Sequence, residues 1–392
     1  MNKRNPTRAQ MAINAAPPSE RDRIALLAFE LPGEPRSPVN YAVRLAGAIE
    51  ERGLDVHLFC NKPTSFHRSH LVRGFESDPA PVAQARALCS SAVAHIGRVG
   101  QEVGSFTALH AIQWSSAPAV LGSARPGQNR AVVTFLDTVF SRYGKMNGSL
   151  ENAQVRRLEQ EAADECDTVL AGSEPVRQEL AWLYNATKAK IITADAVECP
   201  EPSRETNNGA PRLVFIGSWD AAGGADLFVD TALNLATDVS PWEFVVGGDV
   251  VSRARLQADL RRRGQIELLA RFNVEETTAA ALAPGAIALV PARGAASSAP
   301  VFAAWRAGCP VIVTRAGPYY DVEDEVNGLR AFPFAQSLAD AARALAKGAE
   351  QIRLWGEAGR RKVENQFTWP AVAAMLELIY REKTTVALIS NG

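Results

Sequence analysis

The sequence lacks the features of a disulfide-rich or zinc-binding protein. Its five cysteines are odd in number, lie far apart and include no C-x-x-C pair. We therefore expect neither a disulfide framework nor a zinc site, and a reducing, cytoplasmic compartment fits this cysteine usage best. The five histidines all lie in the N-terminal half, without the spacing of a metal site or of a Ser-His-Asp arrangement. We expect no metal and no other cofactor.

Long apolar runs and an excess of one charge are also missing. No run approaches the roughly 18 to 20 apolar residues of a membrane-spanning helix, so we expect no transmembrane segment. Residues 1–22 lack the apolar stretch of a secretory signal and are expected to form a disordered tail. With 42 Lys and Arg against 43 Asp and Glu, the net charge of -1 does not indicate nucleic acid as a partner. A peripheral membrane partner or a protein partner stays open.

The chain alternates strand-like and helical segments in two blocks. Its 392 residues suit two domains of ordinary size. In the first block, apolar residues at helical spacing from Ala42 to Ile49 separate two strand-like runs, and this alternation predicts a mostly parallel sheet. The predicted strands are residues 24–29, 54–59, 108–112, 131–135, 168–171 and 190–193, with further helices at residues 150–166 and 174–183.

A polar segment rich in Pro and Asn, residues 198–212, interrupts the alternation and is predicted to be a linker. The alternation then restarts, which predicts a second doubly wound domain. Its strands are expected at residues 213–216, 244–246, 266–269, 286–290 and 311–313, followed by helices at residues 336–347, 351–364 and after Trp369-Pro370. The predicted organisation is a tail (1–22), an N-terminal domain (23–197), the linker (198–212), a C-terminal domain (213–368) and a last helix with a tail (369–392).

Several motifs resemble those of the retaining family 4 glycosyltransferases in order and spacing. The most specific pair is AGCPV at residues 307–311 and VNGL at residues 326–329, and FIG at residues 215–217 adds to it. The resemblance implies an α/β protein of the GT-B type, with two doubly wound Rossmann-like domains facing across a cleft. It also implies that the last helix crosses back to the N-terminal domain, and that the partners are a nucleotide-sugar donor and an acceptor.

The side chains that usually carry the chemistry of this family are missing on the donor side. Ala295 and Ala303 stand where the family places two glutamates, and Ser218 and Gly223 stand where it places an Arg and a Lys for the donor diphosphate. A diphosphate carries about two negative charges, and leaving them without cations in a partly dry site costs several kcal/mol. The usual reaction therefore needs other groups here.

One candidate for such groups is the segment of residues 293–300, between a predicted strand and a helix. Ser297 and Ser298 stand near the expected helix start, where backbone N–H groups favour phosphate, and Arg293 offers a positive charge. The alternative is that the serines only cap the helix and that Arg293 is solvated. Residues at other strand ends complete the candidate donor set: Gly217, Ser218, Gly247 and Asp249.

Asp249 is a candidate contact for a sugar or ribose hydroxyl. The alternative is that it caps a helix after a pair of ordinary turn glycines. No G-x-G-x-x-G fingerprint accompanies these glycines, so a nicotinamide cofactor is not expected.

Asp137 is the candidate catalytic residue on the acceptor side, because it follows an apolar strand at its carboxyl end. We expect it to orient an acceptor hydroxyl, although an Asx-type turn explains it equally well. Leu136 stands where the family has a His, and Arg36-Ser37 stands where it has a Gly-Gly pair. Arg36, Ser37 and Arg142 are the candidate acceptor-side residues.

Three functions remain open at this level. The resemblance implies a glycosyltransferase that moves a sugar from a nucleotide-activated donor to an acceptor hydroxyl, with retention, in glycan or glycolipid assembly. The alanines at both glutamate positions instead favour a catalytically inactive binding or scaffold protein. A transferase with another donor or acceptor chemistry is the third, because a fold does not determine a function.

Overall fold

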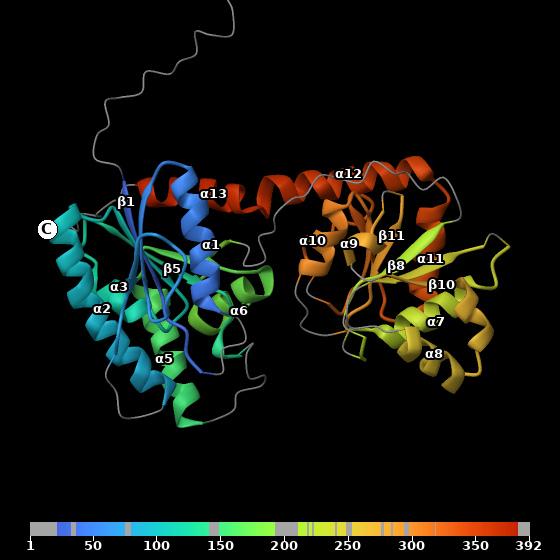
Figure 1. Ribbon diagram of the computed structural model, residues 1–392, viewed down its shortest axis with the longest axis horizontal. Coiled ribbons are helices and arrows are strands. Elements are labelled where there is room, and N and C mark those ends of the chain that lie inside the picture. The colour runs from blue at the N-terminus through green and yellow to red at the C-terminus, as the bar shows by residue number, and fades with distance from the viewer. Residues whose placement is uncertain are drawn as a thin grey trace, which may run out of the picture. The chain divides into compact units, whose positions relative to one another are not determined.

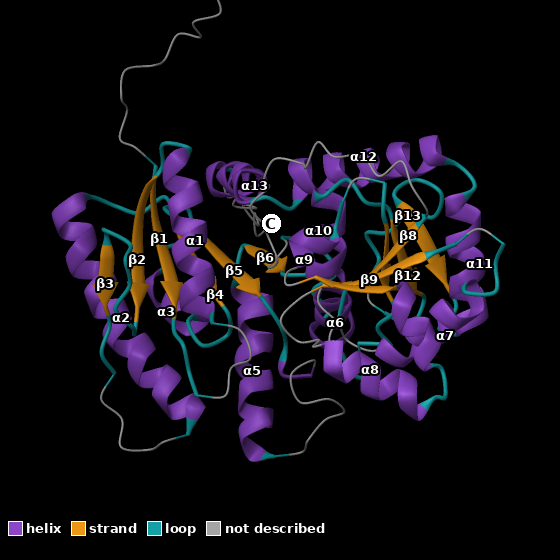
Figure 2. Ribbon diagram, turned by 45° about the vertical axis from the view of Figure 1, so that its right-hand side comes forward, coloured by secondary structure: helices purple, strands orange, loops and turns teal. Residues whose placement is uncertain are grey.

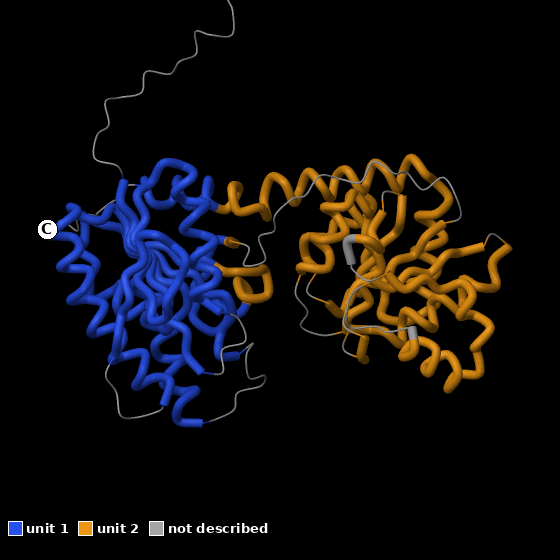
Figure 3. Tube along the Cα trace, viewed as in Figure 1, with its two compact units in different colours: residues 1–170, 179–190, 373–392 blue, residues 171–178, 191–372 orange. Residues whose placement is uncertain are grey.

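The computed structural model forms two compact units, which we describe separately (Figure 3). Unit 1 comprises residues 1–170, 179–190 and 373–392, and unit 2 comprises residues 171–178 and 191–372. Of the predicted tail and linker, only Asp22, Pro211 and Arg212 lie in the part of the chain that is described. The described residues are 22–32, 37–74, 80–140, 149–192, 211–217, 219–221, 223–239, 241–247, 253–275, 278–283, 285–293, 298–317 and 319–382.

Unit 1 is built on a seven-stranded sheet in the order β3-β2-β1-β4-β5-β6-β7. The pairs formed by β1, β2, β3, β4 and β5 are parallel, and the arrows of β1 and β2 point the same way in Figure 2. The strands are β1 (Arg23–Ala28), β2 (Asp55–Cys60), β3 (Ser69–Leu71), β4 (Ala108–Ile112), β5 (Arg130–Phe135), β6 (Thr168–Ala171) and β7 (Lys190–Ile191).

Helices cover this sheet because its strands are apolar along their whole length. Every residue of β4 is buried, for example, as expected for a parallel strand with packing on both faces. Helix α1 packs on β1 and β2, and α3 packs on β4 and β5. Among the described residues, the helices of this part of the chain are α1 (Pro38–Glu51), α2 (Pro81–Val103), α3 (Ala117–Ser123), α5 (Leu150–Glu165) and α6 (Glu174–Tyr184).

Unit 2 repeats this plan with a six-stranded sheet in the order β10-β9-β8-β11-β12-β13, all of whose pairs are parallel. Its strands are β8 (Arg212–Phe215), β9 (Glu243–Gly247), β10 (Phe272–Glu275), β11 (Ile287–Val290), β12 (Val311–Thr314) and β13 (Gly328–Ala331). Its helices are α7 (Ala225–Leu235), α8 (Arg253–Arg262), η1 (Ile266–Arg271), α9 (Thr278–Ala281), α10 (Ala299–Arg306), α11 (Ala335–Ala346) and α12 (Ala349–Gln366), before α13 (Trp369–Arg381) (Figure 1).

Two separate cores lie on the two faces of the second sheet. Leu213 and Phe215 of β8 belong to one core, and Val214 belongs to the other. Successive side chains of a strand point to opposite faces, so this division means that both faces are covered. Both units are therefore Rossmann-like α/β layers, which confirms the predicted fold class.

One strand was predicted in the wrong place. The run at residues 266–269 is apolar, but it forms the 3-10 helix η1, and the strand β10 follows at Phe272. Phe272 is 1% exposed and pairs with Phe244 of β9, whereas Ile266 is 39% exposed. Leu268 of this run and Phe272 of β10 both belong to the buried core, so the run contributes to the core from a helical turn and the strand begins only at Phe272. The short edge strands β3 and β13 were not predicted.

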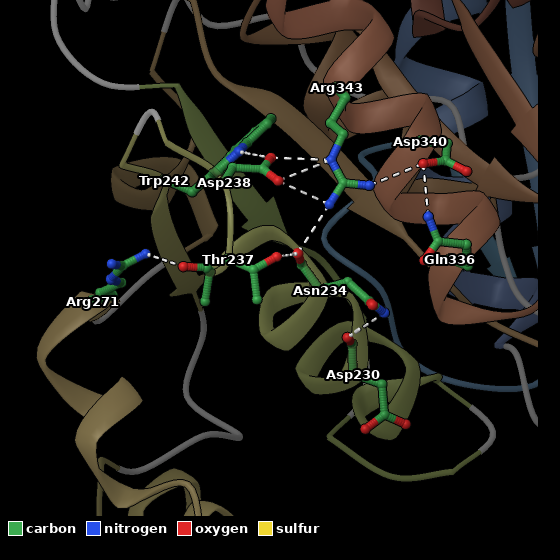
Figure 4. A network of polar contacts seen from close by, with 10 residues as sticks. Asp230, Asn234, Thr237, Asp238, Trp242, Arg271, Gln336, Asp340 and Arg343 are labelled. Carbon is green, nitrogen blue, oxygen red and sulfur yellow. Dashed lines mark hydrogen bonds and ion pairs between the residues drawn. The ribbon is translucent and has the colours of Figure 1, made fainter.

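The C-terminal end of helix α7 is fixed by Arg343 of α11 (Figure 4). The Arg343 guanidinium donates to the Asp238 carboxylate at 2.9 and 3.1 Å and to the Asn234 carbonyl at 2.9 Å. Asp238 also accepts from the indole N–H of Trp242 at 3.0 Å. This network therefore holds α7, α11 and the segment before β9 together at one end of α7.

Among the described residues, we find no helix with both the length and the apolarity to span a bilayer.

A buried histidine connects α13 to the sheet of unit 1. His110 of β4 is fully buried, and its ring nitrogens contact the Tyr380 hydroxyl at 2.6 Å and the Thr134 hydroxyl at 2.7 Å. Burial lowers the pKa of His110 to about 3. The ring therefore stays neutral in the folded protein at every pH near neutrality.

We expect acid to destabilise unit 1 through this histidine. The pKa is about 6.5 in an unfolded chain, so between that pH and about 3 the unfolded state binds more protons, and stability falls as the pH falls. His110→Gln removes the titration and should reduce the pH dependence by up to about 1.4 kcal/mol per pH unit. Urea unfolding at several pH values, followed by hydrogen exchange in β4, measures this. Identical pH dependence in both proteins would contradict the assignment.

Candidate functional site

The carboxyl ends of β8, β9 and β11 lie at one edge of the sheet in unit 2, because these neighbouring strands are parallel. The strand order reverses between β8 and β11, and open α/β sheets bind ligands at such a point, beyond the carboxyl ends. Three predicted donor-side residues lie there. Gly217 follows β8, Gly247 ends β9, and Arg293 follows β11.

The loop after β8 lies directly on the end of β11. Gly224 has a φ of +81°, and a Cβ at this position would lie only 2.2 Å from the carbonyl oxygen of Pro291. A side chain at position 224 would clash with the Pro291 carbonyl, and the positive φ of this residue also favours glycine. Gly224 is also the N-cap of α7. The contact therefore brings the N-terminus of α7 to the segment that carries Arg293.

Arg293 forms a two-pronged ion pair with Asp226, which lies in the first turn of α7. Its two terminal nitrogens each lie 2.7 Å from a carboxylate oxygen, and one also donates to the Ala221 carbonyl at 3.1 Å. Hydrogen bonds from Arg293 hold the pKa of Asp226 below its usual range, and Asp226 raises the pKa of Arg293. The pair is partly exposed, at 36% for Arg293 and 41% for Asp226. Arg293 is thus paired rather than simply solvated.

Ser298 is the N-cap residue of α10, and Pro300 lies in its first turn, but the Ser298 side chain makes no capping hydrogen bond. Ala303, at a glutamate position of the resembled family, is half-buried on α10 and packs against the core. The remaining predicted donor-side residues, Ser218, Asp249 and Ser297, lie outside the described residues, as does Ala295.

In unit 1, Asp137 follows β5 and accepts a hydrogen bond of 2.6 Å from the side-chain amide of Gln113. Gln113 follows the neighbouring strand β4, is 2% exposed and has a φ of 74°, which is rare for a residue with a side chain. Its amide oxygen accepts from the backbone N–H of Leu136 at 3.1 Å. Strained residues of this kind gather at functional sites. The amide of Gln113 therefore fixes the position of the Asp137 carboxylate.

Two glutamates hold the chain just after Asp137. The Thr138 hydroxyl donates to Glu179 of α6 at 2.5 Å, and the backbone N–H of Val139 donates to Glu159 of α5 at 2.9 Å. Glu159 is fully buried and also accepts from the Tyr184 hydroxyl. Burial and then the charge of Glu159 raise the pKa of Tyr184. The segment that presents Asp137 is therefore fixed on both sides.

Of the other predicted acceptor-side residues, only Ser37 is described. Its hydroxyl accepts from the backbone N–H of Asn40 at 3.1 Å as the N-cap of α1 and donates to Glu30. Arg36 and Arg142 lie outside the described residues.

The sequence patterns did not indicate Gln113, Glu179 or Asp226 as site residues. A glutamine directly after a buried strand was the signal for Gln113. The other two lie on helices whose contacts the sequence does not reveal. In the part of the chain that is described, no three His, Cys, Asp or Glu side chains are placed to hold a metal ion.

Comparison with protein families matches both parts of the chain. Residues 39–193 match a family described as Glycosyltransferase Family 4, and residues 210–348 match one described as Glycosyl transferases group 1. Together the two matches span about three quarters of the 392 residues. A search of curated protein sequences finds no match.

Solved structures with a similar fold cover nearly the whole chain. Sucrose-phosphate synthase of Thermosynechococcus elongatus has 18% identity and a TM-score of 0.61, covering 92% of this chain and 98% of that one. A glycosyltransferase of Rickettsia africae has 13% identity and a TM-score of 0.66, covering 94% and 100%. HepE of Anabaena, solved with UDP and glucose, has 14% identity and a TM-score of 0.58, covering 92% and 99%.

The contact of Gly224 with Pro291 can be tested by adding a methyl group. Gly224→Ala must both adopt a positive φ and displace the Pro291 carbonyl, so we expect a loss of stability of more than about 2 kcal/mol. Gly264→Ala is the matched control: Gly264 has a φ of +68°, but a Cβ there meets nothing within 4 Å. Its cost should stay near 1 kcal/mol, roughly the cost of the backbone conformation alone. Equal losses, measured by urea unfolding, would show that the close approach does not matter.

Proposed function

The chain belongs to the family 4-like glycosyltransferases of the GT-B type, and we propose that it moves a sugar from a nucleotide-activated donor to a hydroxyl of an acceptor in glycan or glycolipid assembly. Matches to transferase families in both halves of the chain support this proposal. Three of the similar structures are of HepE with UDP, UDP and glucose, or UDP-glucose, which favours a nucleotide-sugar donor. The scaffold hypothesis gains no comparable support.

The main support for the proposed donor site is the position of Arg293. Its guanidinium follows β11, at the point where the strand order of unit 2 reverses. A guanidinium binds phosphate through the same two-pronged geometry as a carboxylate. In the structure, the Asp226 carboxylate accepts both of these hydrogen bonds from Arg293. A donor diphosphate would therefore have to replace Asp226 as the partner of Arg293. The N-terminus of α10 at Ser298 adds the positive end of a helix dipole. These groups would supply the positive charge that the missing Arg and Lys provide in the resembled family.

Transfer breaks the bond between the sugar carbon and the diphosphate oxygen, and the leaving diphosphate keeps the electron pair. Donors that bind this developing charge lower the barrier most. The acceptor oxygen forms the new bond, with retention as the expected stereochemistry. We assign Asp137 to orient the acceptor hydroxyl and to draw off its proton, and Gln113 to hold the carboxylate in place. No glutamate at position 295 or 303 takes part.

The wider binding sets form part of the same proposal. On the donor side we propose Gly217, Ser218, Gly247, Asp249, Arg293, Ser297 and Ser298, and on the acceptor side Arg36, Ser37 and Arg142.

We also propose a cytoplasmic location and no nucleic-acid partner. Four of the cysteines, Cys60, Cys89, Cys166 and Cys309, are buried and unpaired, which suits a reducing compartment. A peripheral membrane or protein partner remains compatible with transfer to a glycolipid.

Nucleotide binding tests the donor site. We expect at least one nucleoside diphosphate or its sugar to bind in a calorimetric titration, and Arg293→Ala to weaken binding by about 1 to 3 kcal/mol. Asp226→Asn should act in the opposite direction, because it removes the carboxylate that competes for Arg293. Added salt should weaken binding in the wild-type protein.

Arg343→Ala is the matched control, because Arg343 also pairs with an aspartate of the α7 region but at the other end of that helix. It should lower the stability of unit 2 and leave nucleotide affinity unchanged. If no nucleotide binds at millimolar concentration to the folded protein, the transferase proposal fails. If nucleotides bind equally well to wild type and Arg293→Ala, the donor site lies elsewhere.

Restoring one family glutamate should not restore the usual site. Ala303→Glu places a carboxylate on α10 without adding a cation for the diphosphate, so we expect no large gain in hydrolysis or transfer of a nucleotide-sugar. The assay is nucleoside diphosphate release by wild type and variant. A gain of more than about tenfold, or about 1.4 kcal/mol in the barrier, would mean that the positive charge is already sufficient.

A further inference from the structure

One tryptophan differs sharply from all the others in its exposure. The chain has seven tryptophans, and the structure describes all of them. Six are at most 9% exposed, whereas Trp182 on α6 is 74% exposed. A single exposed apolar residue is ordinary, but an indole left in water gives up a large area of favourable burial. The residues in contact with Trp182 indicate whether the exposed indole can bind a ligand.

Trp182 lies beside the segment that presents Asp137. Its ring contacts the ring of Phe140 edge to face, with centroids 5.8 Å apart. Glu179, one helical turn before Trp182, accepts the 2.5 Å hydrogen bond from Thr138. Thr138 follows Asp137 directly, and Phe140 comes two residues later. The exposed indole, a second aromatic ring and two carboxylates therefore occupy one region of unit 1.

We propose that Trp182 and Phe140 form the stacking surface for a sugar ring of the acceptor. This inference rests on the proposed function, in which Asp137 orients an acceptor hydroxyl. It extends that function by naming the acceptor class, which is a glycan that is neutral near the reacting hydroxyl. Trp182 acts in binding the acceptor and not in the chemical step.

The chemistry of a sugar matches this surface. A pyranose ring has an apolar C–H face, which packs on an aromatic ring, and hydroxyl groups at its rim, which donate to carboxylates. Sites for such ligands combine aromatic area with a few polar groups that fix orientation. Trp182 and Phe140 supply the aromatic area, and the Asp137 carboxylate supplies an acceptor.

The charges beside Trp182 favour a sugar over a lipid surface. Membrane-binding helices place Lys and Arg around their exposed aromatic residues, because those cations are attracted to anionic lipids. Among the described residues, Glu179 and Asp137 are the carboxylates held by hydrogen bonds in the segment before Phe140, and the cation Arg156 interacts with Tyr184 of the same helix. Arg177 of the same helix is already paired with Glu174, at 2.5 and 2.7 Å. The two carboxylates disfavour an anionic surface and can accept hydrogen bonds from an uncharged, hydroxyl-rich ring.

Fluorescence quenching gives a direct test, because iodide reaches an exposed indole and not the six buried ones. The full chain is titrated with cellobiose, maltose, lactose and mannobiose while iodide quenching is measured. We expect at least one disaccharide to protect Trp182 from iodide in a saturable manner. Trp182→Phe, which keeps a ring, should lose the quenchable emission but retain calorimetric binding of that sugar.

Trp182→Ala should weaken sugar binding by about tenfold, the size expected for loss of one stacked ring. Leu378→Ala is the matched control, because Leu378 is 73% exposed on α13 and its loss should change nothing. Affinity for nucleotides should be the same in wild type and both variants.

The parallel nucleotide titration separates this inference from the proposed function. If the folded protein binds a nucleotide but none of the sugars protects Trp182, or if Trp182→Ala binds sugar as well as wild type, the inference is wrong and the transferase proposal stands. If anionic phosphatidylglycerol vesicles protect Trp182 and the sugars do not, the inference is also wrong. If a sugar protects Trp182 while no nucleotide binds, the stacking surface stands and the transferase proposal fails.

Discussion

The close approach of Gly224 to the Pro291 carbonyl is the contact on which the candidate donor site depends. Gly224 has no side chain, and this allows the start of α7 to lie against the segment that follows β11, where a Cβ would clash with the Pro291 carbonyl. Asp226 in the first turn of α7 is then within hydrogen-bond distance of Arg293. A longer distance at this point would leave Arg293 unpaired and the helix N-terminus away from the strand ends. The close contact of Gly224 with Pro291 thus places the two charges of the Arg293–Asp226 ion pair next to each other.

The ion pair with Asp226 holds the Arg293 guanidinium in one orientation before any ligand binds. A partly exposed ion pair contributes little to stability, so exchanging its carboxylate for a diphosphate costs little. The site therefore keeps its cation oriented and remains open to a stronger anion. The Arg343–Asp238 pair is different, because it holds three backbone segments together and its exchange would loosen α7 (Figure 4). In the proposed function, the same ion-pair chemistry serves anion binding at one end of α7 and stability at the other.

The alternation of apolar strands and amphipathic helices made the fold predictable. Most predicted strands agree with the structure to within one or two residues, because each is a short apolar run between helices. The run at residues 266–269 misled us because a short apolar segment does not distinguish a strand from a turn of helix. The contacts of the site were harder to predict. Gln113 and Asp137 are 24 positions apart, and Asp226 and Arg293 are 67 apart, so only the folded sheet brings them together. The exposure of Trp182 likewise follows from what the fold leaves uncovered.

The central claim is that Arg293 exchanges Asp226 for the diphosphate of a nucleotide. A crystal structure of the protein with a bound nucleoside diphosphate tests it most directly. We predict that the diphosphate oxygens lie within hydrogen-bond distance of the Arg293 guanidinium, with the Asp226 carboxylate turned away from it. A nucleotide bound at another place, with the Arg293–Asp226 pair still intact, would contradict the claim.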